Sequence, residues 1–126
     1  RANIMNSEKA KINIDGELEY TQSTGELYTG PSESFYDNGN IQHSGQYENG
    51  LMEGVWKYYY PDGKIFAKIS HLMGRPSGLN ETFYEDGTLS LRGFSEEGKR
   101  VGVWTTYNPD GSIEKEEEYK DGTLIN

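Results

Sequence analysis

The sequence predicts an all-β fold: an elongated, twisted, single-layer antiparallel β-meander of stacked hairpins, each of about 24 residues. Three observations predict it. Glycines recur with one period, each period holds strand and turn signals, and no long 3.6-residue apolar pattern indicates a helix. Consecutive hairpins of this kind predict roughly eight to ten strands in one sheet about 40–48 Å long.

The period is carried by three glycine series, whose members are each separated by one repeat length. They are Gly30, Gly54, Gly78, Gly102; Gly39, Gly63, Gly87, Gly111; and Gly50, Gly74, Gly98, Gly122. An aromatic series (Phe35, Tyr59, Phe83, Tyr107) and an aliphatic series (Ile41, Ile65, Leu89, Ile113) keep the same step. "GVW" and "PDG" recur only in every second unit, so the closest similarity is between alternate units, which indicates duplication of a two-unit block.

These series divide the chain into a single repeat domain, residues 12–126. Its units are 30–53, 54–77, 78–101 and 102–126, preceded by a degenerate unit, 12–29, in which "DGELEY" resembles a turn and a second strand. Terminal repeats are often atypical. Residues 1–11 show no pattern and are interpreted as a leader or a capping segment.

The unit that starts at Gly54 shows how one hairpin is encoded. "VWKYYY" is β-branched and aromatic, which favours a strand. In "YPDGK", Pro61 presets its own φ and Gly63 accepts a positive φ, as in a three-residue hairpin loop with a glycine bulge. "KIFAKIS" is the second strand, and "LMGRPSG" turns into the next unit.

A register for this hairpin assigns residues to the two faces of the sheet. Pairing Tyr60 with Lys64 places Tyr59 opposite Ile65, Lys57 opposite Ala67, and Val55 opposite Ile69. One face then holds Val55, Tyr59, Ile65, Ala67 and Ile69, and the other holds Trp56, Tyr58, Tyr60, Phe66 and Lys68. The first keeps its apolar character between units and is interpreted as the structural ladder. The second varies more, since Asn80 and Ser90 replace Trp56 and Phe66.

Composition excludes several classes of site. There is no cysteine, so disulfides, thiolate zinc sites and cysteine nucleophiles are absent. The net charge of −9 opposes binding to nucleic acid or to an anionic membrane, and neither is expected. The same charge either attracts a basic protein partner or only keeps an open sheet soluble. No apolar run approaches the roughly 18 residues of a membrane span.

Three polar groups are candidates for sites. The turn residues Asp62, Asp86 and Asp110 do not supply the six to eight oxygens that Ca²⁺ prefers, and no metal or other cofactor is expected. His43 and His71 are the only histidines, and no strained nucleophile turn accompanies them, so no catalytic residue and no enzyme activity are expected. An acidic patch is either a docking site or a charged edge that prevents sheet pairing; it comprises Glu96, Glu97, Glu114, Glu116, Glu117 and Glu118.

Aromatic residues form the other candidate site. The candidate partner-binding face consists of Trp56, Tyr58, Tyr60, Phe66 and Trp104, because Trp and Tyr are frequent interface anchors and also stack on sugars. Cross-strand packing explains the same residues equally well. A one-layer sheet does not bury both of its faces unless something covers one of them.

The repeat resembles a known family. "GVWKYYYPDGKI" and "GVWTTYNPDGSI", followed by "YENGLMEG" and "YKDGTLIN", are similar to the bacterial variant of the MORN repeat, over about three quarters of the chain. YwqK-type antitoxins of toxin–antitoxin systems are largely built of such repeats, and similar repeats occur in secreted or lipid-anchored bacterial proteins. The units at Gly30 and Gly78 depart from the pattern because they lack the Trp. The resemblance implies a single-layer hairpin sheet and an interaction role, and it names no ligand.

Two functions therefore remain open. The first is a non-catalytic protein-interaction module, an antitoxin or immunity protein that binds a basic toxin in the cytoplasm. The alternative is a secreted or envelope-anchored repeat protein that binds a surface partner or glycan, which would require a targeting segment ahead of Arg1. The sequence predicts no oligomeric state.

Overall fold

The computed structural model describes residues 10–12, 18–20 and 26–126. The strands are β1 (Ala10–Ile12), β2 (Leu18–Tyr20), β3 (Gly30–Phe35), β4 (Ile41–Glu48), β5 (Leu51–Tyr59), β6 (Ile65–Leu72), β7 (Arg75–Phe83), β8 (Leu89–Glu96), β9 (Lys99–Tyr107), β10 (Ile113–Lys120) and β11 (Thr123–Leu124). Among the described residues there is no helix of the length and hydropathy that a membrane crossing needs.

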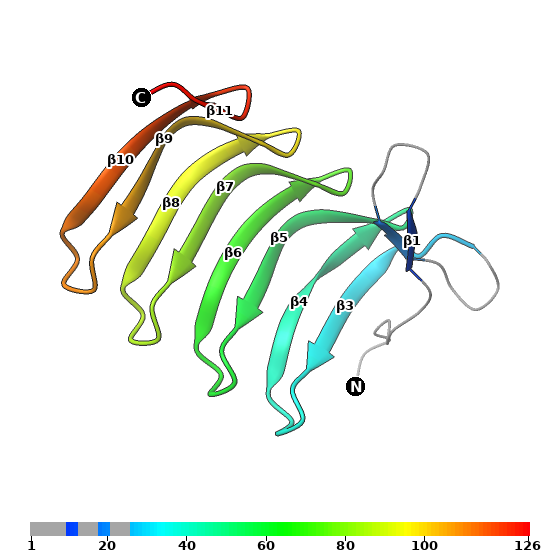
Figure 1. Cartoon of the computed structure of the whole chain (residues 1–126). Helices are drawn as coiled ribbons and strands as arrows, with labels where there is room; N and C mark the ends of the chain where they lie inside the picture. The colour runs from blue at the N-terminus through cyan, green and yellow to red at the C-terminus, as the bar shows by residue number, and fades with distance from the viewer. Residues whose placement is uncertain (1–9, 13–17, 21–25) are drawn as a thin grey trace.

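Nine strands form one open antiparallel sheet, in the order β11-β10-β9-β8-β7-β6-β5-β4-β3. Each strand therefore pairs with its neighbours in sequence, which confirms the expected meander. Figure 1 shows the strands as curved ribbons side by side in one layer, with the turns alternating between the two ends of the hairpins. β1 and β2 pair with each other in a separate two-stranded sheet. The predicted leader and degenerate unit lie largely outside the described residues, so that division stays a prediction.

The three-residue loops have the predicted chemistry. In the loop after β5, the Tyr60 amide donates to the Lys64 carbonyl at 2.7 Å, and Gly63 has a φ of 95°. The Asp62 carboxylate accepts the Lys64 amide at 2.9 Å. Asn38, Asp86 and Asp110 make the same bond two residues ahead in their own loops. These side chains therefore hold the hairpin loops.

The loop sides of neighbouring units are joined by tyrosines. The Tyr60 hydroxyl donates to the Phe83 carbonyl at 2.7 Å, one unit further along the chain. Tyr36 and Tyr84 donate in the same way to the carbonyls of Tyr59 and Tyr107, both at 2.5 Å. Because each hydroxyl finds an acceptor in the next unit, Tyr60 is a structural connection between repeats.

The register differs from the expected one beyond the first pair. Tyr59 faces Ile65 as predicted, but Tyr58 faces Ala67 and Trp56 faces Ile69. A β-bulge at Phe66 adds one residue to β6, and this shift moves every later side chain of β6 to the other face. The predicted pairs Lys57–Ala67 and Val55–Ile69 are therefore wrong, and Ala67 and Ile69 lie on the same face as Trp56. All four hairpins have a bulge at this place.

The two-residue turns between units place residues in the left-handed region. Asn49, Met73, Glu97 and Asp121 have φ of 50–53°, and each precedes a glycine whose φ is also positive. Consecutive positive φ values are the geometry of a type I′ turn, which favours Asn-Gly. Asn49 suits its position, whereas Met73 bears a strained backbone there.

Replacing Met73 with Asn should therefore stabilise the chain. We expect Met73→Asn to raise the free energy of unfolding by roughly 0.5–1 kcal/mol, measured by urea denaturation. The Met73 side chain is 67% exposed, so little packing is lost. The reciprocal change, Asn49→Met, is the matched control and should lower stability by a similar amount. Equal stability of all three proteins would contradict the assignment of strain to Met73.

Candidate interaction surfaces

The core of the sheet lies on one of its faces. We call it the tryptophan face, and it is defined by Tyr47, Trp56, Ala67, His71 and Trp104. Trp56 is 1% exposed and Trp104 is 3% exposed, although no second layer of described residues covers them. They are buried because each indole lies flat on the sheet and is enclosed by neighbouring side chains.

Two strand glycines make this arrangement possible. A Cβ atom at Gly45 would lie 2.1 Å from the nearest atom of the Trp56 ring, and a Cβ atom at Gly93 would lie 2.1 Å from the nearest atom of the Trp104 ring, too close for either ring to stay in place. The indole Nε1 of Trp56 donates to the Gln46 carbonyl at 3.1 Å, and that of Trp104 to the Phe94 carbonyl at 2.9 Å. Each tryptophan thus packs on the backbone of the preceding strand with its polar atom satisfied.

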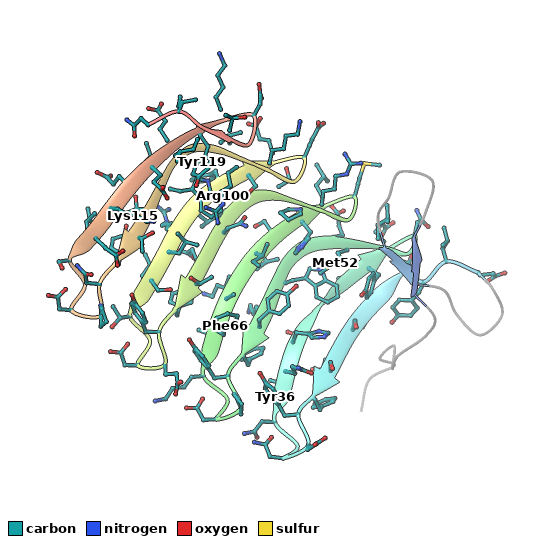
Figure 2. All side chains as sticks on the ribbon, viewed as in Figure 1. Tyr36, Met52, Phe66, Arg100, Lys115 and Tyr119 are labelled. Carbon is teal, nitrogen blue, oxygen red and sulfur yellow. The ribbon has the colours of Figure 1, made fainter. Side chains whose placement is uncertain are left out.

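Aromatic rings and a guanidinium enclose the two indoles. Around Trp56, the Tyr47 ring lies edge-on at 5.0 Å between centroids, with His43 at 6.0 Å and His71 at 6.3 Å. Around Trp104, the Arg100 guanidinium lies 4.1 Å from the ring centroid and also contacts Tyr119. Figure 2 shows Arg100 and Tyr119 next to each other on β9 and β10. Ring–ring and cation–π contacts of this kind replace the missing second layer.

The predicted partner-binding residues therefore have different environments. Trp56 and Trp104 are core residues, and half-buried Tyr58 packs against the Tyr47–Trp56 cluster. Half-buried Tyr60 bonds the next unit, and burial, Glu85 and Asp62 raise the pKa of its phenol. Phe66 is 43% exposed and packs edge-on against the Tyr60 ring at 5.2 Å. Of these residues Phe66 offers the most free surface, and partner binding by the set stays a prediction.

The acidic residues do not form one continuous patch. Glu96 and Glu97 lie at the turn between β8 and β9. On β10, Glu116 and Glu118 face Thr105 and Val103, whereas Glu117 faces Trp104 and pairs with Lys115 at 3.6 Å. Alternation along the strand places Glu116 and Glu118 on the face opposite Glu117. Glu114 is the bulge residue of β10, where strict alternation does not hold. Their docking role is likewise untested.

The second surface is the side of the sheet opposite the tryptophans, here called the open face. It carries Val55, Tyr59, Phe94 and Val103. Of the expected structural ladder, Val55, Tyr59 and Ile65 lie here, whereas Ala67 and Ile69 lie on the tryptophan face. Val55 is 51% exposed, Phe94 is 49% exposed and Val103 is 50% exposed. The ladder pair of Tyr59 with Ile65 is half-buried on this face. The roles of the two faces are thus the reverse of those expected, because the indoles pack on Gly45 and Gly93 and the bulge adds Ala67 and Ile69 to their face.

The open face is hollowed across β3, β4 and β5. The hollow has a volume of about 690 Å³, and its lining includes Pro31, Val55 and Tyr59. Three carboxylates, those of Glu33, Glu48 and Glu53, also line it, together with the single cation of Lys57. This part of the surface therefore combines apolar area with an excess of negative charge.

Sequence reasoning missed Gly45 and Gly93. Both lie inside strands, and two repeat lengths separate them, as they separate Trp56 from Trp104. Glycine inside a strand marks a close approach by another group. The recurrence of Trp and strand glycine together in alternate units was the signal that could have paired them.

A family model described as MORN repeat variant matches the chain three times, over residues 28–49, 52–72 and 100–121, which together make up just over half of it. The matched segments include the units with Trp56 and Trp104. No curated protein matches the chain.

The contact between Trp104 and Gly93 predicts that replacing Gly93 lowers the stability of the chain only while Trp104 is present. Gly93→Ala should lower the free energy of unfolding by about 1–3 kcal/mol, because its methyl group displaces the indole. In a Trp104→Ala background the same change should be neutral or slightly stabilising, since the obstructing ring is gone. A double-mutant cycle by chemical denaturation measures the coupling. Equal costs in the two backgrounds would show that the ring does not lie on Gly93.

The two histidines beside Trp56 predict that the free energy of unfolding depends on pH. Burial lowers the pKa of His43 and His71 from the ordinary value of 6.5, and the hydrogen bond to Ile69 partly offsets this for His71. The unfolded chain therefore binds more protons than the folded chain just below pH 6.5, so stability falls as the pH drops through this range. Urea midpoints between about pH 7.5 and 5 should show this fall.

The matched control for the pH dependence is the double variant His43→Gln/His71→Gln. It should have a flatter profile over the same pH range, whatever its absolute stability. An identical slope in the double variant would mean that other groups carry the dependence.

Proposed function

The chain belongs to the MORN repeat variant family, and from that premise we propose that it is a non-catalytic protein-interaction module whose open face binds a basic partner protein. The main support for this proposal is the hollow on β3–β5, where Val55, Pro31 and Tyr59 lie among three carboxylates. Apolar area ringed by charge is typical of a protein-binding surface.

The charges support a basic partner. Glu33, Glu48 and Glu53 outnumber Lys57 around the hollow, and the whole chain carries a net charge of −9. Such a field accelerates encounter with a positively charged protein and repels acidic ones. The exposed apolar side chains of Val55, Phe94 and Val103 supply area that a partner can bury.

The finer proposal is that this partner is a basic toxin and that the chain is its antitoxin or immunity protein. The acidic open face and the similarity of the repeats to those of YwqK-type antitoxins support it. A cytoplasmic location follows if the toxin acts there. We place the secreted or envelope-anchored alternative second, because the indole faces of Trp56 and Trp104, the best platforms for sugar stacking, are covered.

Site-specific photo-crosslinking in the native host tests the binding face. A benzophenone amino acid at Val55 should capture one basic protein, whereas the same group at Met73, which is as exposed but lies in a turn, should capture it several-fold less. Raising the salt concentration from about 0.05 to 0.5 M should weaken capture, because exposed charges are then screened. Glu33→Lys/Glu53→Lys should weaken it in the same way.

Equal capture at Val55 and Met73, or capture of acidic proteins, would contradict the proposed surface. The antitoxin proposal has its own test. Expression of the captured protein alone should stop growth, and co-expression with the chain should restore it. Normal growth without the chain would reject the antitoxin proposal and leave the binding module standing.

A further inference from the structure

Two lysines lie directly opposite each other on the open face, on the neighbouring strands β5 and β6 (Figure 1). Lys57 pairs with Lys68 in the register of the sheet. Lys57 follows Trp56 along β5, so its side chain points away from the tryptophan face. Lys68 lies between Ala67 and Ile69, which belong to the tryptophan face, so it also points to the open face. Two cations therefore stand side by side on the surface that we propose for partner binding.

This like-charge pair is peculiar to one of the four described hairpins. The positions one or two repeat lengths away hold the pairs Glu33–Ser44, Glu81–Arg92 and Thr105–Glu116. Like charges directly opposite each other in an antiparallel pair destabilise a sheet. Lys57 and Lys68 thus lower the stability of the free chain at a place where the other units have a neutral or an attractive pair.

The described residues do not neutralise the two lysines. Glu81 lies directly opposite Lys68 on β7, but its carboxylate pairs with Arg92 at 3.5 Å. The Lys68 ammonium instead lies 5.9 Å from the centroid of the Phe83 ring. Neither Lys57 nor Lys68 forms an ion pair within the described part of the chain. In a chain with a net charge of −9, the pair is therefore a local positive site.

The lysine pair adjoins the acidic hollow. Lys57 lines that hollow together with Glu33 and Glu53. Glu33 lies on β3, two strands from Lys57 on β5, which corresponds to roughly 10 Å at the usual strand spacing. The open face thus presents negative charge and, one or two strands further on, two positive charges. A partner that complements both has to carry a cation and an anion at a similar separation.

We propose that Lys57 and Lys68 together receive one carboxylate of the basic partner protein, while cations of the same protein engage Glu33 and Glu53. The carboxylate removes the repulsion between the two ammonium groups and is attracted by both of them. Nucleic acids and anionic membranes do not fit the site, because the carboxylates around the hollow repel a polyanion.

Such a pair makes the chain selective among basic proteins. A partner surface of uniform positive charge would meet repulsion at Lys57 and Lys68, whereas a basic surface with one well-placed carboxylate would not. This inference names a feature of the partner and rests on the proposed function.

The variant Lys57→Glu separates the lysine site from general attraction between charges. It makes the hollow more negative, so general attraction alone would increase the capture of a basic protein at Val55. Loss of the carboxylate site should instead reduce capture about three- to tenfold at about 0.05 M salt. Lys64→Glu, in the loop after β5, is the matched control with the same charge change and should not reduce capture. Capture that Lys57→Glu leaves unchanged or increases would overturn the proposal.

Urea denaturation of the free chain measures the repulsion between the two lysines. Lys57→Glu places an opposite charge across from Lys68, so it should raise the urea midpoint. In a Lys68→Gln background the same change should bring less gain, because the opposing cation is absent. A raised midpoint also excludes unfolding as the reason for reduced capture. Equal effects of Lys57→Glu in the two backgrounds would show that the ammonium groups do not meet, and would overturn the proposal.

Zero-length coupling identifies the carboxylate on the partner. A carbodiimide activates a carboxylate, which then forms an amide bond with a lysine amine that it contacts. In the complex captured at Val55, this reagent should join Lys57 or Lys68 to an Asp or Glu of the partner, as read by mass spectrometry. Coupling of the partner only to other lysines would overturn the proposal.

The failures of the two proposals are distinguishable. If no basic protein is captured at Val55, the open-face proposal is rejected and the lysine site with it. If a basic protein is captured at Val55 but Lys57→Glu does not reduce its capture, the lysine site alone is rejected.

Discussion

A sheet that no second layer of described residues covers has to build its core on its own surface, and in this chain an indole packs on a strand glycine to do so. Trp56 and Trp104 lie against Gly45 and Gly93 and are almost completely buried. An indole removes a large apolar area from water, and glycine lets the ring approach the backbone closely. The Nε1 hydrogen bonds to Gln46 and Phe94 satisfy the one polar atom that burial would otherwise leave unpaired.

This constraint explains why the repeat has two periods. Hairpin and loop chemistry recur in every unit, because every unit needs its turn glycines and most use a tyrosine to reach the next unit. The Trp–Gly pair recurs only in alternate units. Between the two pairs, Asn80 stands in place of the tryptophan and Ile69 in place of the glycine. The hairpin and loop residues are thus kept in every unit, whereas the side chains that pack on the sheet differ between units.

Most of the fold was predictable from local chemistry, whereas the assignment of side chains to the two faces of the sheet was not. Pro61, Asp62 and Gly63 identify their loop because each acts on its own backbone, and the glycine series sets the strand order. The bulge at Phe66 is a property of two strands together, and no residue type in "KIFAKIS" signals it. One extra residue moved Ala67 and Ile69 to the face of Trp56. The expected binding face is the core because its indoles pack on Gly45 and Gly93. The replacement of Trp by Asn80 is visible in the sequence as a departure from the repeat, but what it changes in the packing depends on knowing that Trp56 is buried.

The difference between the two faces of the sheet follows from the same packing. One face is occupied by the indoles and their neighbours, which leaves Val55, Phe94 and Val103 exposed on the other.

The most direct test of the account is hydrogen exchange of the two indole N–H groups, followed by NMR. If both indoles lie on the sheet as described, their exchange should be as slow as that of the central strand amides, which requires global unfolding. Exchange at the rate of a free indole would show that the rings leave the sheet surface, and the proposed core would then be wrong.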